Sequence, residues 1–426
     1  MQAMPLRRPS ASDLPPDLLS AATRVARTLV EAGFQAWIVG GAVRDLALGR
    51  EPVDVDMASD ALPDEVEALF ERSLAVGKAF GTVVVMMGGV QVQVTTFRAE
   101  QGYSDGRRPD GVSYGSSVEV DARRRDFTCN AMYLDPLDDR FRDPEQGLAD
   151  LERGRLRCVG DAELRFGEDG LRMVRLGRFC ARLGLDPDPD ALAAASRCLD
   201  VLRAVSGERL RAELEGLLTA EDPARGLRVL EAAGVLAHLF AGLDGISERV
   251  AAMERLPAPP AFASALAVLL FEETAQLEGL RPSRALCRSV LAIWRSCGRL
   301  EALLSGAVAG RSARLALMAD EAWPGAVETL AARRPQLAEA LARLTAERDS
   351  LAPEQLRPVP WIGSDDLSAC GLEPGPRWGS LLAEAFELQL DGAWRDREQG
   401  LEWLRTTLSE EGQEGGKAPR KPHERG

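Results

Sequence analysis

The sequence predicts an α+β fold, in which a head with a mixed sheet is followed by a long all-helical remainder. Two observations support this class. Strand-like apolar runs are confined to residues 36–135, and Gly88-Gly89 between two of them is typical of a hairpin. From about residue 150 to 405 apolar residues recur with helical spacing, and prolines mark the breaks. We therefore expect no strand after about residue 150.

The elements of the head follow from the same patterns in chain order. An amphipathic helix is expected over 18–33. Five strands are expected after it, over Ala36–Val39, Val53–Ala58, Thr82–Met87, Val90–Phe97 and Ala131–Leu134. Short helices are expected over Ala42–Leu48 and over Pro63–Arg72, which begins with the residue favoured at the first helical position.

Composition excludes several classes of protein. The chain has 426 residues, enough for several domains, and its two histidines are too few for a histidine-based metal centre. The seven cysteines show no CxxC spacing, so we expect free thiols in a reducing compartment. No apolar run is long enough to span a bilayer, and the first residues lack the apolar core of a secretory signal. We therefore expect a cytoplasmic protein without membrane contact.

Charge is unevenly distributed along the chain. The formal net charge is -14, which by itself argues against a nucleic-acid partner. Residues 151–182, however, hold eight arginines against five acidic residues, a local charge of +3. This segment is a candidate for contact with phosphate groups.

A glycine pair provides the first candidate site. Gly40 and Gly41 end an apolar strand and precede a helix, so that backbone amides can approach a phosphate closely. Arg44 would lie in the first turn of that helix and reach the same phosphates. Taken alone, the pair also fits a tight turn beside a surface arginine.

Two carboxylates provide the second candidate site. Asp54 and Asp56 are two residues apart in a predicted strand and so project from one face, while Val53 and Val55 would point into the core. Two acids there require positive charge, and a pair of divalent metal ions clamping a triphosphate would supply it. The combination with the glycine pair indicates a nucleotidyltransferase.

Two later segments carry candidate nucleotide contacts. In the segment 124–131, Arg124 and Asn130 can hydrogen-bond ribose hydroxyls and phosphates, although a basic loop entering a strand would look the same. In the segment 166–175, Asp169 and Arg172 are three residues apart and thus neighbours on one helix face, which Arg175 extends.

An acceptor beside a donor complements the pairing edges of cytosine and adenine. Uracil and guanine would instead set acceptor against acceptor, and each buried group left unpaired costs about 1–3 kcal/mol. The Asp169–Arg172 pair is therefore a candidate for template-free base selection, although an ordinary ion pair on a solvated face would show the same spacing.

Taken in order, these motifs resemble the class II tRNA nucleotidyltransferase and bacterial poly(A) polymerase family. The segments are GGAVRD, DVD, VTTFR, RRDFTCNA and EDGLRMVR. The resemblance is strong over residues 36–182 and weaker near 371–376, and residues 220–350 show only helical character. It implies a template-independent enzyme that adds C and A to the 3′ end of tRNA, using CTP and ATP.

The resemblance also implies roles for individual residues. Asp54 and Asp56 would be the catalytic residues and would bind two Mg²⁺ ions. The other implied residues contact the nucleotide: Gly40, Gly41 and Arg44 the triphosphate, Arg124, Asp126 and Asn130 the ribose or phosphates, and Asp169 and Arg172 the base, with Arg175 beside them.

Two features bear on the subtype, and a third concerns the strength of catalysis. Residues 75–82, with Ala79 before Phe80, look like the tRNA type rather than a poly(A) polymerase. Residues 99–123, with Asp105, Arg107, Arg108 and Pro109, look like the full-length flexible loop that CC-only enzymes lack. Gln93 stands where the family has a third carboxylate, and we expect it to be tolerated because Asp54 and Asp56 carry both metals. An enzyme that adds only the terminal A, and a poly(A) polymerase, remain alternatives. A non-catalytic RNA-binding relative and an aminoglycoside nucleotidyltransferase rank lower.

The expected domain order follows the family's head, neck, body and tail. We expect a flexible segment over 1–16, the catalytic head over 17–150 and a helical neck that recognises the base over 151–220. A helical body over 221–350, a tRNA-binding tail over 351–405 and a disordered end over 406–426 would follow. The expected partner is tRNA, and no protein partner is implied.

Overall fold

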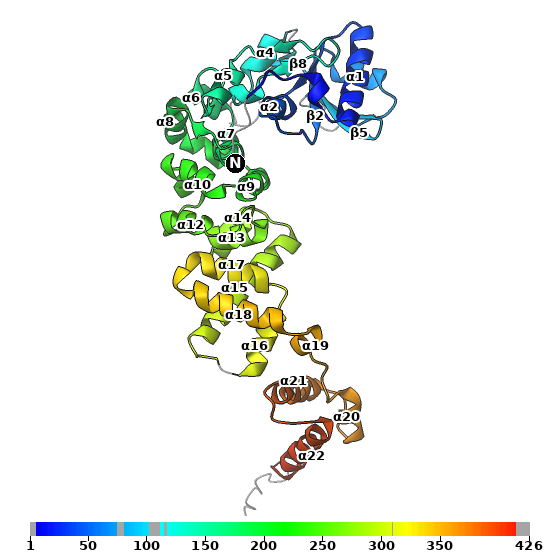
Figure 1. Ribbon diagram of the computed structural model, residues 1–426, viewed down its shortest axis with the longest axis vertical. Coiled ribbons are helices and arrows are strands. Elements are labelled where there is room, and N and C mark those ends of the chain that lie inside the picture. The colour runs from blue at the N-terminus through cyan, green and yellow to red at the C-terminus, as the bar shows by residue number, and fades with distance from the viewer. Residues whose placement is uncertain (1–5, 75–80, 102–110, 115–116, 309, 415–426) are drawn as a thin grey trace, which may run out of the picture. The chain divides into compact units, whose positions relative to one another are not determined.

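The computed structural model describes residues 6–74, 81–101, 111–114, 117–308 and 310–414 (Figure 1). Its internal contacts divide the chain into two compact units, residues 1–287 and 288–426. The first unit begins with the only large sheet of the described residues and continues as helices. The second unit is helical throughout its described part. This boundary lies inside the predicted body, and the predicted neck, body and tail limits remain predictions.

A seven-stranded mixed sheet forms the centre of the head. Its order is β3-β4-β5-β2-β1-β8-β9, in which β2 and β5 are parallel and the other neighbours antiparallel. The strands are β1 (Ala36–Val39), β2 (Val55–Ser59), β3 (Ser73–Leu74), β4 (Thr82–Met87), β5 (Val90–Thr96), β8 (Tyr133–Leu134) and β9 (Phe141–Arg142). A separate ribbon joins β6 (Arg98–Gln101) to β7 (Gly111–Tyr114). The predicted mixed sheet is confirmed, and β1 and β4 have the predicted bounds.

Short helices surround the sheet and bury its apolar side chains. They are η1 (Ala11–Asp13), α1 (Pro16–Glu31), α2 (Gly41–Ala47), α3 (Pro63–Leu69), α4 (Val118–Arg123), η3 (Thr128–Asn130) and α5 (Gly147–Glu152). Helix α1 has proline at its first position and packs its apolar stripe against β5 and β1. A core beneath the sheet includes Trp37, Ala58, Phe97 and Tyr133.

The rest of the first unit is a succession of packed helices. They are α6 (Ala162–Glu168), α7 (Leu171–Leu183), α8 (Pro189–Arg197), η4 (Leu199–Ala204), α9 (Gly207–Leu218), α10 (Pro223–Ala232), α11 (Val235–Leu239), α12 (Ile246–Met253), α13 (Phe262–Leu269) and α14 (Thr274–Gly279). Helices α7 and α10 approach so closely that a Cβ on Gly226 would lie 2.4 Å from the carbonyl oxygen of Gly177. The prediction of no strand here was wrong by one short pair, in which β10 (Arg155–Leu156) runs parallel to β11 (Asp186–Pro187).

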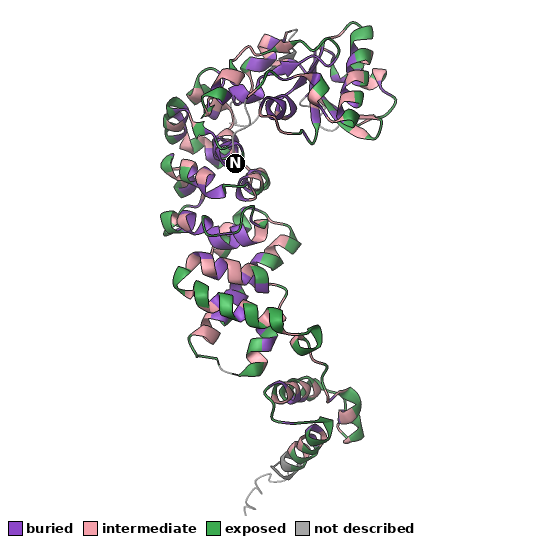
Figure 2. Cartoon of the chain, viewed as in Figure 1, coloured by how far each residue is buried: buried purple, intermediate pink, exposed green. Residues whose placement is uncertain are grey.

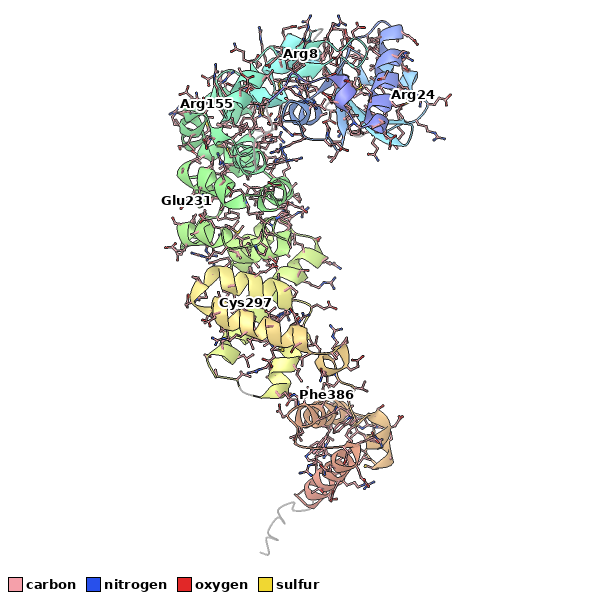
Figure 3. The ribbon with its side chains drawn as sticks, in the orientation of Figure 1. Arg8, Arg24, Arg155, Glu231, Cys297 and Phe386 are labelled. Atoms are coloured by element: carbon pink, nitrogen blue, oxygen red, sulfur yellow. The ribbon has the colours of Figure 1, made fainter. Side chains whose placement is uncertain are left out.

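The second unit contains a larger and a smaller helical cluster. Its helices are α15 (Arg284–Leu304), which starts at the boundary, α16 (Arg311–Met318), α17 (Trp323–Arg333), η5 (Pro335–Leu337), α18 (Ala338–Ser350), α19 (Pro353–Leu356), α20 (Ser364–Ala369), α21 (Pro376–Leu390) and α22 (Arg397–Glu414). Cys297 lies buried in α15 (Figure 3). The last three helices share a core that includes Leu367, Leu381, Trp394 and Leu404, and the purple faces of Figure 2 mark such buried residues.

Defined contacts and elements extend to both ends of the described chain. The backbone N–H of Ala11 donates to Asp139 Oδ1 at 2.7 Å, and Ser10 Oγ donates to Asp139 Oδ2 at 3.1 Å. Helix α22 continues to Glu414. The predicted flexible segment at 1–16 and the predicted disorder from residue 406 stay predictions. Within the described ranges, no helix combines the length and the apolar character needed to cross a bilayer.

Candidate active site

The glycine pair lies at the turn between β1 and α2. Gly40 has a φ of 75°, a left-handed conformation that side-chain-bearing residues rarely adopt. A Cβ on Gly40 would lie 3.8 Å from Arg125 Nη1, and one on Gly41 would lie 3.6 Å from Arg44 Nη2. The turn therefore brings bare backbone next to two guanidinium groups, a combination that suits an anionic phosphate. The Arg44 group is buried and forms an ion pair with Asp45 at 2.8 Å.

The two predicted acids lie beside this turn. Asp56 pairs in register with Val39, the residue that precedes the glycine pair. Asp54 precedes β2 and is exposed, and Val53 is 85% exposed, so the prediction that Val53 points into the core was wrong. Strand β2 begins only at Val55, which is the residue that enters the core.

The Asp56 carboxylate lies in a partly buried and electrostatically unfavourable environment. Burial, and then the charge of Asp54, raises the pKa of Asp56 to about 6, while Arg125 acts in the opposite direction. Its Oδ1 atom is buried and has no hydrogen-bond partner among the described residues. A buried carboxylate oxygen beside a second acid matches the hard oxygen ligands that Mg²⁺ prefers, so these two residues fit a divalent cation.

Gln93 lies directly beside Asp56. The two residues are in register on the parallel strands β2 and β5, so their side chains point to the same face of the sheet. Gln93 is exposed on that face. The position of the missing third carboxylate is therefore next to the two acids, where an amide supplies an oxygen without a charge.

A buried carboxylate that sequence reasoning missed holds the two arginines after α4. Asp121 is fully buried, and its Oδ2 accepts hydrogen bonds from Arg125 Nη2 at 2.8 Å and from Tyr133 Oη at 2.7 Å. Its Oδ1 accepts from Arg124 Nε at 2.8 Å. Burial alone would raise the pKa of Asp121, but the charges of Arg125 and Arg124 lower it to about 2. The i,i+3 and i,i+4 spacing was the signal that could have identified this residue.

Four of the predicted residues form one hydrogen-bonded chain. Arg44 Nη1 donates to Asn130 Oδ1 at 2.8 Å, and Asn130 Nδ2 donates to Asp126 Oδ1 at 3.1 Å. Asp126 Oδ2 accepts from Arg175 Nε at 2.7 Å. Burial would raise the pKa of Asp126, but Arg175 and the hydrogen bond from Asn130 lower it well below its usual range. The chain links the glycine turn to helix α7 through residues 126–130.

The predicted base-reading pair is arranged differently from the prediction. Helix α6 ends at Glu168 and α7 begins at Leu171, so Asp169 is in extended backbone and shares no helix face with Arg172. Asp169 accepts from Arg209 on α9, with 2.6 Å between Nη2 and Oδ2 and 3.3 Å between Nη1 and Oδ1.

Arg172 pairs with Glu168 and donates to the carbonyl oxygen of Arg124 at 3.1 Å. Sequence reasoning missed the two residues that hold the predicted base-reading pair, which are Glu168 for Arg172 and Arg209 for Asp169. Glu168 was detectable by its i,i+4 spacing from Arg172, whereas Arg209 is 40 residues from Asp169.

Two groups of predicted features lie outside the described residues. Lys78, Ala79 and Phe80 belong to the gap at 75–80, and Asp105 to Pro109 belong to the gap at 102–110. The features that distinguish the subtypes therefore stay predictions.

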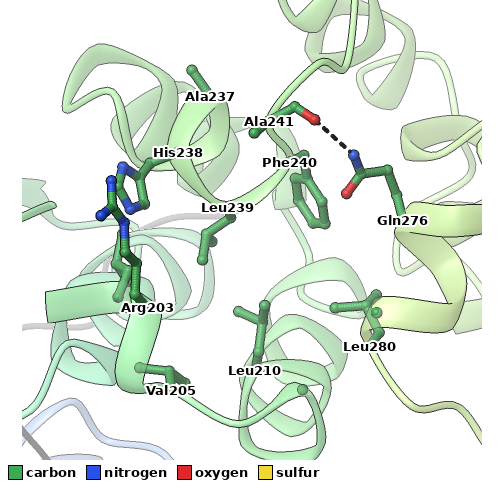
Figure 4. A pocket seen from close by; sticks show the side chains of 13 residues that line it. Arg203, Val205, Leu210, Ala237, His238, Leu239, Phe240, Ala241, Gln276 and Leu280 are labelled. Atoms are coloured by element: carbon green, nitrogen blue, oxygen red, sulfur yellow. Dashed lines mark hydrogen bonds between the residues drawn. The ribbon is translucent and has the colours of Figure 1, made fainter. Parts of the chain in front are cut away.

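A separate pocket lies among the later helices of the first unit. It has a volume of about 420 Å³ and is lined by residues of η4, α9, α11 and α14. Figure 4 shows Arg203 next to His238 at one side, and Gln276 donating to the carbonyl oxygen of Ala241 at 2.9 Å at another. None of the predicted site residues lines this pocket.

Comparisons with known proteins identify the family to which the chain belongs. The Poly A polymerase head domain matches residues 36–157, and the family described as the probable RNA and SrmB-binding site of polymerase A matches residues 184–246. The CCA-adding enzyme of Lactiplantibacillus plantarum is 34% identical over 384 residues, which are 87% of this chain and 92% of that protein. The CCA-adding enzyme of Levilactobacillus brevis is 42% identical over 220 residues, and this match spans only 55% of its length.

Solved structures give the same family. The structure of the Bacillus stearothermophilus CCA-adding enzyme in complex with CTP has a TM-score of 0.75 and 28% identity, and it covers 94% of this chain and 100% of that one. The Thermotoga maritima CCA-adding enzyme complexed with tRNA shares the fold, with a TM-score of 0.70 and 22% identity over 95% of this chain. The chain belongs to the family of CCA-adding enzymes.

Proposed function

We propose that this protein adds C and A nucleotides to the 3′ end of tRNA without a template. The tRNA 3′-hydroxyl attacks the α-phosphate of CTP or ATP, the new phosphodiester forms, and pyrophosphate leaves. The observation that carries the proposal is the Asp56 carboxylate, which has a buried oxygen without a partner beside Asp54 and the glycine turn. Membership of the CCA-adding family supports the choice of tRNA, CTP and ATP as substrates.

Within this proposal Asp54 and Asp56 hold Mg²⁺, as a pair of ions. When bound, the metal supplies charge that neutralises the triphosphate and lowers the pKa of the attacking hydroxyl. Arg44 and Arg125 hold the phosphates against the turn at Gly40. These residues act mainly by positioning and by neutralising charge, which are the principal contributions to phosphoryl transfer.

The remaining site residues select the nucleotide. Asp126 and Asn130, tied between Arg44 and Arg175, present polar atoms to the ribose. Arg124 orders the loop through Asp121. Asp169 offers an acceptor and Arg172 a donor to the pairing edge of cytosine or adenine. Uracil and guanine would leave these groups unpaired, which costs about 1–3 kcal/mol for each group.

The test of this proposal is substitution of the acids. Asp54→Ala and Asp56→Ala are expected to abolish incorporation of labelled CTP and ATP into tRNA, with tRNA affinity kept within about threefold, because phosphate contacts elsewhere dominate binding. The measurement pairs an incorporation assay with a filter-binding titration. Loss of tRNA binding in step with activity would make the acids structural and would contradict their catalytic role.

Two finer points belong to the same proposal. We assign complete CCA addition rather than A-only addition on membership of the CCA-adding family. The full-length 99–123 segment supports an enzyme that is able to add the terminal A, and the tRNA-type sequence at 75–82 argues against poly(A) synthesis. We also assign a cytoplasmic location, where the tRNA substrate is found.

A further inference from the structure

The contacts of Asp169 point to an additional determinant of nucleotide specificity. We propose that Arg209 is a specificity-determining positioning residue, which holds the Asp169 carboxylate as a fixed acceptor for the amino group of the incoming base. This inference rests on the proposed function, because it assumes that Asp169 reads the base. The candidate comes from the fold alone, since the two residues are 40 positions apart in sequence and lie on different elements.

The backbone around Asp169 is fixed by packing, whereas its side chain is held by hydrogen bonds. A Cβ on Gly170 would lie 2.8 Å from the carbonyl oxygen of Val201, so the turn between α6 and α7 packs tightly against η4. Asp169 itself has a φ of -153° and projects from extended backbone rather than from a helix. The N–H of Leu171 at the start of α7 restricts one oxygen of its carboxylate, and side-chain contacts must restrict the rest.

Arg209 supplies this restriction through two hydrogen bonds to the carboxylate. Its Nη2 and Nη1 atoms reach Oδ2 and Oδ1 of Asp169, and the N–H of Leu171 donates to Oδ1 at 3.1 Å. The side chains of Arg209 and Asp169 are 29% and 17% exposed, so the pair is largely screened from water. An ionised carboxylate accepts about four hydrogen bonds, so three are used and a position remains for a base amino group.

Arg172 is the alternative partner of Asp169. Arg172 lies three residues further on and is held by Glu168, while Asp169 is held by Arg209. The two pairs keep the acceptor and the donor from neutralising each other. Without Arg209, Asp169 is free to turn towards Arg172, and the site then loses the acceptor that rejects a carbonyl at the same position of uracil or guanine.

The planar fork of arginine is essential to this role. A lysine keeps the positive charge but donates from a single point, so it cannot fix the plane of the carboxylate. Arg209→Gln removes the charge as well. We expect the preference for CTP over UTP, as a ratio of kcat/KM, to fall about tenfold or more in Arg209→Gln. In Arg209→Lys it should fall by a smaller factor.

The experiment measures single-nucleotide addition of CTP, ATP, UTP and GTP to a tRNA transcript that ends before CCA. Arg203→Gln is the matched control, because it removes a neighbouring arginine whose ion pair with Asp200 is exposed. Thermal melting and tRNA binding verify that each variant is folded. The double variant Arg209→Gln with Asp169→Asn should be no less selective than Asp169→Asn alone, since Arg209 acts through Asp169.

The outcomes separate the two levels of inference. A lower CTP preference in Arg209→Gln, absent in Arg203→Gln, supports the positioning role. Equal losses of kcat/KM for all four nucleotides in both Arg209 variants would mean a merely structural role and would overturn the proposal. If the unmodified protein adds neither C nor A to tRNA, the proposed function itself fails.

Discussion

Single side chains determine the chemistry of the head, and Asp56 illustrates this most clearly. It is held partly buried beside Asp54 with one oxygen unpartnered, which is costly for folding and useful for binding a cation. Asp121 has the opposite environment, because two arginines and a tyrosine satisfy it. We propose that the first carboxylate binds a cation, whereas hydrogen bonds hold the second within the fold.

The environment of Asp56 predicts how the stability of the fold changes with pH. The pKa of Asp56 is raised to about 6 in the folded chain, so its ionisation costs stability as pH rises from about 4 through 6. Asp56→Asn should then raise the free energy of unfolding by about 1–3 kcal/mol at pH 7–8 in the presence of a chelator, and by little at pH 4. Urea unfolding at the two pH values measures this. An Asn variant that is less stable at pH 8 would contradict the burial argument.

Gln93 provides a prediction about the missing third charge. It lies in register with Asp56 on the neighbouring strand, so Gln93→Glu places a carboxylate next to the two acids. Because Asp54 and Asp56 are proposed to carry both metals, turnover at saturating Mg²⁺ should change by less than about tenfold, a difference of about 1.4 kcal/mol. Steady-state incorporation across a magnesium titration tests this. A rise in turnover of several orders of magnitude would show that the third acid is essential.

The elements show how much a local pattern can predict. Strands β1 and β4 have the predicted bounds because alternating or fully apolar runs between turn residues have one favourable arrangement. The glycine turn lies beside Asp56, and Arg44, Asn130, Asp126 and Arg175 form one hydrogen-bonded chain. The nucleotide contacts expected of these residues stay predictions. Asp169 was misplaced because the break between α6 and α7 falls within the motif, where periodicity predicts one continuous helix.

Packing partners distant in sequence could not be predicted. Arg209 orients Asp169 through a contact that only the tertiary fold creates, since the two residues are 40 positions apart. The short pair β10–β11 was missed because two residues carry no detectable alternation. Local patterns thus specify elements and motif positions, whereas the partners that orient a motif depend on which elements pack together.

The crossing of α7 and α10 predicts a position that tolerates no side chain. A Cβ on Gly226 would lie 2.4 Å from the carbonyl oxygen of Gly177 and 2.9 Å from Ala181 Cβ. Gly226→Ala should therefore lower the free energy of unfolding by about 1–3 kcal/mol. Gly167→Ala is the control, because this helical glycine has no neighbour within 4 Å of its Cβ position, and it should raise stability by about 0.5–1 kcal/mol. Thermal melting decides; equal effects at both sites would refute the close-packing explanation.

The whole molecule combines a small catalytic region with a much longer helical chain. The predicted site residues all lie in the first of the two compact units, and the second unit contains none of them. The net charge of -14 coexists with an arginine-rich segment at 151–182, whose arginines largely pair with nearby acids. Overall charge is therefore a poor guide to the partner of such a chain, and the identity of the site residues is a better one.

The most direct measurement is incorporation of labelled CTP and ATP, separately and together, into three tRNA transcripts that lack CCA, end in C, or end in CC. We predict that all three are extended to CCA and that extension then stops. Addition of A only, and only to the transcript ending in CC, would reduce the activity to A addition. Long A tails on any RNA, or no incorporation at all, would contradict the proposal that this chain completes the CCA end of tRNA.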